Sequence, residues 1–332
     1  MGGLSKKAYQ QDTISSEQNL PYLKVDAGGL LFKQDTISPA KRKQDKATAA
    51  GIAEAYSFMH YSAVGIARKD LAAGLKFLHE IDKESRFPWL SANLINTEDQ
   101  TPLFRPFTTL KVSDITVGII GITDTTADAK LHNEENAALL DWQKVLPGIA
   151  DDLSKTCDLI ILLSSLAEDQ NREIARTQPN IHIIVQATGA SGNKHPERMN
   201  NTLITQTGKQ GKYLGVMEID WHSAGTWSRG DTKKLLGQKK SQIDRIEWQL
   251  SKYRRKGDPE EIFKDLPNKL NAYRRIIARK QVLEREIKEI EIVMAEEKRS
   301  AAPSTFSNRF IAMNTSLPDN LQVKEIVGKI KK

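Results

Sequence analysis

The sequence is short of cysteine, because Cys157 is the one thiol among 332 residues. A lone cysteine excludes an internal disulfide framework and a cysteine-rich zinc site. Long apolar runs are missing too, and none approaches the ~20 residues that cross a bilayer. The stretch Met1–Lys7 has no apolar core of the kind found in a signal peptide. With 39% hydrophobic and 27% charged residues, the chain fits a soluble globular protein in which Cys157 is a buried structural thiol.

Histidine is also scarce, and its spacing gives no metal motif. No two of the six histidines lie four residues apart, so a zinc-binding helix face is excluded. Two other motifs are equally weak. The glycine-containing stretch Gly189–Lys194 lacks the spacing of a phosphate-binding loop and is interpreted as a surface loop. The pair Ser164 and Ser165 has no evident His and Asp partner for nucleophilic catalysis.

The basic charge is not spread evenly. The formal net charge is +7, and residues 229–299 carry twenty Lys and Arg against thirteen Asp and Glu. The remainder of the chain is therefore neutral, with twenty-nine residues of each sign. A local excess of this kind favours an acidic partner or surface for that segment alone.

Strands alternate with helices over the first two thirds of the chain, which predicts a layered α/β domain. The unbroken apolar runs 159–163 and 181–185 are typical of strands buried on both faces. Asp70 is expected to cap a helix over 71–80. The other predicted elements are helices over 4–11, 47–59, 142–153 and 168–176, strands over 21–30, 64–66, 202–206 and 215–220, and a hairpin over 104–121.

After Trp227 the periodicity changes to steps of three and four. Such spacing predicts a long antiparallel helical hairpin that resembles a coiled coil, broken near Gly257. We therefore expect an α/β domain over residues 1–228, a basic helical hairpin over 229–302, and a strand and helix tail over 303–332. The apolar residues that set the period are Ile243, Ile246, Leu250 and Tyr253, then Leu283, Ile287, Ile290 and Met294.

Several segments follow the order found in one family. The stretch Tyr61-Ser-Ala-Val-Gly-Ile-Ala-Arg-Lys-Asp-Leu-Ala-Ala-Gly74 resembles Tyr-Asp-Ala-(apolar)-x-(apolar)-Gly-Asn-His-Glu-Phe-Asp-x-Gly. That pattern belongs to the calcineurin-like metallophosphoesterases of the 5′-nucleotidase and UDP-sugar hydrolase branch. Further matches are Gly2–Ala8, Val25–Gly29, Phe87–Asn93, Val117–Thr123 and Gln206–Gly215. The resemblance covers roughly residues 2–220 and implies an α/β/β/α sandwich; the family's first strand, with its Asp-x-His pair, would precede Gly2.

The family uses two metal ions to polarise a phosphate and activate water. Its ligand and catalytic positions fall here on residues without ligand side chains. The bridging Asp falls on Gly29, the Asn and His on Arg68 and Lys69, one His on Ser165, and two on Thr188 and Ala190. Asp26 and Asn93 match family residues but are interpreted as turn and strand-end residues. The resemblance thus implies a degenerate member with no metal and no cofactor.

A binding or scaffold module is the function that we expect, with the hairpin as the partner arm. One alternative is a working hydrolase of nucleotides or phosphate esters with a rebuilt site. Another is a redox protein, because some relatives carry a Cys or selenocysteine motif upstream of their Gly-Gly-Leu-Ser segment. Such a motif, the missing strand and a secretion signal would all lie upstream of Met1. By resemblance the protein is bacterial and exported to the periplasm if that signal exists.

Two sets of cations are candidate binding residues. Arg68 and Lys69 are candidates for binding a phosphate or nucleotide-like anion, since Arg pairs with oxyanions through two N–H groups; the alternative is that both are solvated surface residues. The hairpin candidates for an acidic protein or anionic surface are Lys252, Arg254, Arg255, Lys256, Arg274 and Arg275. Nucleic acid ranks lowest, because few aromatic residues lie among these cations.

Overall fold

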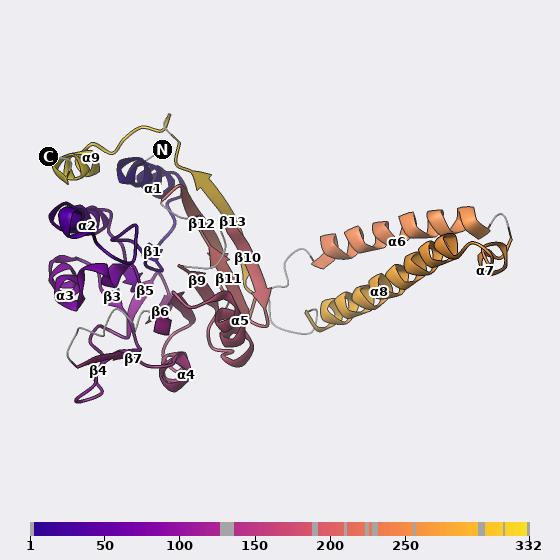
Figure 1. The fold of residues 1–332 in the computed structure, drawn as a ribbon, viewed down its shortest axis with the longest axis horizontal. Coiled ribbons are helices and arrows are strands. Elements are labelled where there is room, and N and C mark those ends of the chain that lie inside the picture. Colours follow the sequence, from indigo (N-terminus) through magenta and orange to yellow (C-terminus); the bar gives the residue numbers. More distant parts are fainter. Residues whose placement is uncertain are drawn as a thin grey trace. The chain divides into compact units, whose positions relative to one another are not determined.

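A computed structural model describes residues 3–126, 136–187, 192–208, 211–222, 226–227, 232–254, 257–297, 303–314 and 316–330. The chain divides into two compact units, Met1–Glu218 with Ser307–Lys332, and Ile219–Phe306. The first unit is an α/β domain (Figure 1). Its helices are α1 Leu4–Gln18, α2 Arg42–Phe58, α3 Leu75–Glu84, α4 Trp142–Ser154, α5 Glu168–Thr177 and α9 Leu321–Ile330, with 3₁₀ turns η1 Pro39–Lys41 and η2 Asp70–Ala73.

Three short strands form the first sheet of this unit. They are β1 Val25–Asp26, β2 Ala63–Gly65 and β3 Trp89–Leu90, parallel and in that order. Helices α2 and α3 cover it, and their apolar residues share one core with β2 and β3. Helix α9 completes this layer against α1 and α2, because Val323 and Ile326 are buried in the same core as Ala8.

The second sheet has six strands in the order β10-β11-β9-β8-β6-β5. The parallel strands β6, β8, β9 and β11 form its centre, and helices α4 and α5 pack on the face opposite the first sheet. All six residues of β8 are buried, as the apolar run predicted. The strands are β5 Phe107–Val112, β6 Ile115–Ile122, β8 Leu159–Ser164, β9 Ile183–Gln186, β10 Lys194–Met199 and β11 Thr202–Gln206.

The two sheets lie face to face, which gives the layered α/β/β/α arrangement expected from the sequence. The sheets approach closely at Gly121 of β6, where an added Cβ would lie 2.2 Å from the carbonyl oxygen of Leu90 in β3. The described residues also form two small sheets, β4 Leu94–Asn96 with β7 Ala137–Leu139, and β12 Tyr213–Asp220 with β13 Thr305–Ala312.

One expectation about local structure was wrong, and one strand was not predicted. Helix α3 begins at Leu75, and its N-cap residue is Gly74 rather than Asp70. The chain first makes the 3₁₀ turn η2, and Gly74, with φ +90°, separates that turn from the helix. Strand β10 was not foreseen because it contains Pro196 among polar residues; as an edge strand with an irregular register there, it tolerates a residue without an N–H.

The second unit contains the helical hairpin, α6 Thr232–Arg254, α7 Pro259–Ile262 and α8 Pro267–Glu297. Ion pairs join Lys239 to Glu286 at 2.7 Å and Glu247 to Lys280 at 2.5 Å. The later residue of α6, Glu247, pairs with the earlier residue of α8, Lys280, so the two helices run antiparallel. Leu250, Leu283 and Ile287 are buried along the seam, as their spacing predicted, and Tyr273, which the predicted spacing did not include, is buried as well.

Candidate functional site

Strands β2, β3, β6 and β8 direct their carboxyl ends to one place between the two sheets, where four buried polar residues meet. Ser91 follows β3, Thr123 follows β6 and Ser165 follows β8, while Asn93 lies just before β4. The Oγ atoms of Ser91 and Thr123 are 2.8 Å apart, and Thr123 donates to the carbonyl of Ile66 at 2.9 Å. All four side chains are at most 1% exposed. We call these four residues the hydroxyl–amide cluster.

Asn93 is the centre of this cluster. Its Nδ2 donates to the carbonyls of Thr123 and Leu140 at 2.7 and 2.8 Å, and its Oδ1 accepts the N–H of Thr123 at 2.9 Å. The hydroxyl of Ser165 accepts the N–H of Asp124 at 2.9 Å. These hydrogen bonds satisfy backbone groups at the strand ends, so the side chains hold the strand ends and their loops in place. Asn93 is therefore a strand-end residue, as predicted.

Asp26 ends β1 and belongs to a second polar group between α1 and α2. Its Oδ2 accepts the hydroxyl of Tyr56 at 2.9 Å and lies 4.0 Å from Nζ of Lys7. The amine of Lys7 also reaches Tyr56 Oη at 3.0 Å and lies over the ring of Tyr61. Burial alone would lower the pKa of Lys7, but Tyr61 and Asp26 outweigh it and raise that pKa. We call Lys7, Asp26, Tyr56 and Tyr61 the lysine–tyrosine cluster.

Lys7 was missed at the level of the sequence. It stands beside Lys6 in a polar N-terminal segment, where exposed lysines are the usual case. The available signal was its spacing, because Lys7 and Gln11 are one turn apart and both lie near the apolar face that contains Leu4 and Ala8. Gln11 donates from Nε2 to Tyr61 Oη at 3.2 Å. Lys7 belongs to the lysine–tyrosine cluster, and Gln11 contacts it.

Asp70 has no exposed surface and ties two loops together. Its carboxylate accepts the backbone N–H groups of Gly29, Leu30 and Leu31 at 2.6, 2.8 and 2.9 Å, and that of Ala67 at 2.9 Å. Burial raises the pKa of Asp70 to about 6, against the opposing effect of these donors. Asp70 therefore fixes the loop after β1 against the loop after β2.

The mapped family positions lie on or near these two loops. Gly29 has φ +72° and uses its N–H on Asp70. Arg68 is half-exposed, and one terminal nitrogen of its guanidinium lies 3.1 Å from Asp35. Lys69 is partly buried beside it. Ser165 belongs to the hydroxyl–amide cluster, whereas Thr188 and Ala190 lie outside the described residues.

The groups at the sheet ends do not fit a pair of divalent cations. Such ions require carboxylate and imidazole ligands whose negative charge and lone pairs face the metal. The hydroxyl–amide cluster is neutral, and its lone pairs and protons serve backbone groups and one another. Asp26 and Asp70 are carboxylates, yet each already accepts hydrogen bonds from its neighbours. Among the described residues, no three His, Cys, Asp or Glu side chains converge on one point.

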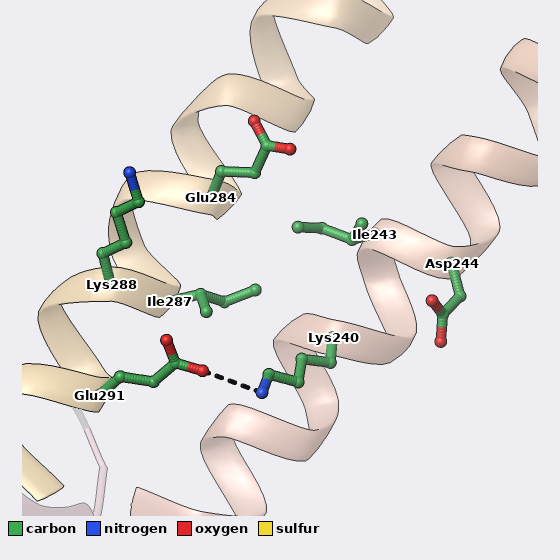
Figure 2. A pocket seen from close by; sticks show the side chains of 7 residues that line it. All are labelled: Lys240, Ile243, Asp244, Glu284, Ile287, Lys288 and Glu291. Carbon is green, nitrogen blue, oxygen red and sulfur yellow. Dashed lines mark ion pairs between the residues drawn. The ribbon is translucent and has the colours of Figure 1, made fainter.

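Four of the six hairpin candidates lie in the described residues, near the turn between α6 and α8. Lys252, Arg254, Arg274 and Arg275 are all exposed, and Arg274 pairs with Glu260 at 2.6 Å. Arg255 and Lys256 lie outside the described residues. Closer to the other end, Figure 2 shows a shallow groove between the helices, in which Ile243 and Ile287 point toward one another. Lys240 and Glu291 close one edge of this groove with an ion pair of 2.9 Å.

The class of this fold follows from comparison with solved structures. The calcineurin-like phosphoesterase YfkN from Bacillus subtilis aligns with 98% of this chain and 90% of its own, at a TM-score of 0.57 and 15% identity. The 5′-nucleotidase precursor from Thermus thermophilus aligns with 68% of this chain and 47% of its own, at a TM-score of 0.54 and 21% identity. The fold is thus that of the calcineurin-like phosphoesterases and 5′-nucleotidases.

The relatives found by sequence include UshA proteins. Protein UshA of Salmonella pullorum is 23% identical over 288 residues, which are 70% of this chain and 51% of the relative. Protein UshA of Escherichia coli K12 is 24% identical over 197 residues, 49% of this chain and 36% of the relative. The resemblance inferred from the sequence is confirmed. The chain spans about half the length or less of these relatives, and no protein-family model matches it.

Proposed function

We propose that this phosphoesterase-like domain is a binding module rather than a two-metal hydrolase, and that the helical hairpin is its partner-binding arm. The observation that carries the proposal is the hydroxyl–amide cluster, which places neutral side chains where the strand ends converge. A neutral cluster leaves the repulsion between two dications uncompensated. Lys7 adds a positive charge near Asp26, the carboxylate at the end of β1.

Metal content and turnover test this proposal directly. The full chain is incubated with Mn²⁺ or Zn²⁺, desalted, and measured for bound metal and for hydrolysis of 5′-AMP and p-nitrophenyl phosphate. We expect far less than one equivalent of metal and no turnover. Two equivalents of metal with turnover that Asp26→Asn abolishes would establish the alternative, an active hydrolase. The matched control is Asp114→Asn, an exposed carboxylate in a hairpin turn.

The ligand that we propose for the α/β domain is a phosphate or nucleotide-like anion at Arg68 and Lys69. Support comes from the buried Nε of Arg68, which has no hydrogen-bond partner among the described residues. Asp35 competes for the same guanidinium, so we expect weak binding. Inorganic phosphate or 5′-AMP, titrated by calorimetry, should bind less tightly to Arg68→Ala. Arg309→Ala removes a similarly half-exposed, paired guanidinium and should change nothing; equal affinity of all three proteins would remove the proposal.

A further inference from the structure

The far end of the hairpin combines positive charge with exposed apolar side chains. Residues 245–280 hold eleven Lys and Arg against five Asp and Glu, a net charge of +6. The rest of the 229–299 segment therefore contributes only +1. The same stretch contains three of the large apolar side chains that are exposed in the described residues, Trp248, Ile262 and Leu266. We call residues 245–280 the hairpin tip.

The acidic residues of the tip are partly neutralised within the hairpin. Glu247 pairs with Lys280 at 2.5 Å, and Glu260 pairs with Arg274 at 2.6 Å. Lys252, Lys264, Lys269 and Arg275 have no carboxylate partner in the described part of the chain. The charge available to an outside partner is therefore positive.

The interior of the tip is filled by other aromatic residues, whereas Trp248, Ile262 and Leu266 remain exposed. The ring of Tyr253 packs edge-on against Phe263 and Tyr273, with centroids 5.7 and 5.9 Å apart. Trp248 is 62% exposed and two positions from the buried Leu250, which places it on the side of α6 away from α8. Nζ of Lys252 lies 3.4 Å from the centre of the Trp248 ring.

We propose that the hairpin tip binds the surface of an anionic phospholipid bilayer; this rests on the proposed role of the hairpin as the partner arm. Lysine and arginine attract acidic headgroups, and an exposed tryptophan beside a lysine suits the boundary between headgroups and acyl chains. Ile262 and Leu266 supply apolar area that enters that boundary. None of the helices in the described residues is long and apolar enough to cross a membrane.

An anionic membrane fits these features better than nucleic acid does. Single-stranded nucleic acid is bound by a row of aromatic residues, whereas Trp248 is the one exposed aromatic among the described tip residues. Isoleucine and leucine contribute nothing to phosphate contacts. An acidic protein would need a complementary apolar surface for the same residues, and a bilayer provides one of any shape.

Vesicle sedimentation tests the proposal with the full chain. Binding is measured to phosphatidylcholine vesicles with about 30% phosphatidylserine, to pure phosphatidylcholine, and to single-stranded RNA and polyglutamate. We expect binding to the anionic vesicles, little to the neutral ones, and loss at about 0.5 M salt, where screening is nearly complete. Lys252→Gln and Arg275→Gln should each weaken vesicle binding by about fivefold.

A combined variant separates the apolar contribution from the charge. Trp248→Ser with Ile262→Ser and Leu266→Ser should lower vesicle binding at least tenfold. Leu20→Ser with Leu321→Ser, two exposed leucines outside the tip, and Lys111→Gln are the matched controls and should bind normally. Circular dichroism checks that each variant keeps its helices.

The proposal is overturned by absent binding to anionic vesicles, by equal binding to neutral ones, or by tip variants that behave like the controls. Tighter binding to RNA or polyglutamate than to vesicles would assign the tip to that class of partner instead. The vesicle experiment involves no metal and no phosphate ester. Its failure is therefore distinct from a failure of the proposed function, which metal content and turnover decide.

Discussion

A single added methyl group at Gly121 should separate the two sheets. Gly121 lies in β6, and a Cβ there would lie 2.2 Å from the oxygen, 2.5 Å from the carbonyl carbon and 2.6 Å from the Cβ of Leu90. Leu90 is in β3, so the obstruction is mainly backbone that cannot rotate away. Carbon atoms in contact prefer about 3.5–4.0 Å. Gly121→Ala therefore requires the strands to move apart by about 1 Å.

The same strand offers a matched control three residues earlier. A Cβ at Gly118 would meet Sγ of Cys157 at 3.2 Å and Cδ1 of Leu153 at 3.3 Å, and both are side-chain ends that can shift. Overpacking a core costs about 1–3 kcal/mol, and an immovable backbone contact lies at the upper end or beyond. We expect Gly121→Ala to lose about 3 kcal/mol or more, and Gly118→Ala to stay within about 1 kcal/mol of the unmodified chain.

Urea unfolding gives the free energies, and hydrogen exchange of peptides that cover β3 and β6 locates the damage. Gly121→Ala should speed exchange in both strands, because their packing on one another is disturbed. A loss no greater than that of Gly118→Ala, with unchanged exchange at β3, would refute the reasoning from the distance between the sheets.

Two further predictions concern stability. Burial lowers the pKa of His182 from 6.5 to about 4, so the folded chain keeps it neutral. The contribution of His182 to the free energy of unfolding is constant above pH 6.5 and falls by about 3 kcal/mol as pH drops to 4. His182→Asn keeps an acceptor for the N–H of Ile160 and should flatten that slope between about pH 6.5 and 4.5, measured by urea unfolding; an unchanged slope would contradict the assignment. Replacing Leu235–Arg299 by a short Gly-Ser linker should leave the melting temperature of the α/β unit within a few degrees, and an unfolded product would show that the hairpin is part of its core.

The layered fold was predictable because its signals are local. Unbroken apolar runs marked β8 and β9, and turn residues marked the hairpin of β5 and β6, whose Ser113 has φ +55°. Asp70 shows the limit of this reasoning. An aspartate before an amphipathic segment is a normal helix cap, yet its carboxylate accepts N–H groups from a loop about forty residues away. No pattern along the chain specifies such a partner.

The candidate site, too, was only partly predictable from the sequence. The sequence placed Ser165, Arg68 and Lys69 at the mapped positions, and the resemblance explained why those positions matter. It did not indicate that Ser165 joins Asn93 in one buried network, or that Asp35 pairs with Arg68. Lys7 was overlooked because its polar partners, Tyr56 and Asp26, come from other elements.

The sequence alone determined which segments are buried, where the basic charge gathers, and which family pattern the chain follows, because periodicity, charge count and motif order are properties of neighbouring residues. The tertiary structure alone decided that Gly121 touches backbone while Gly118 touches side chains, and that neutral groups fill the space at the carboxyl ends of β3, β6 and β8. Those outcomes depend on segments that are distant in sequence and meet only when two sheets pack face to face.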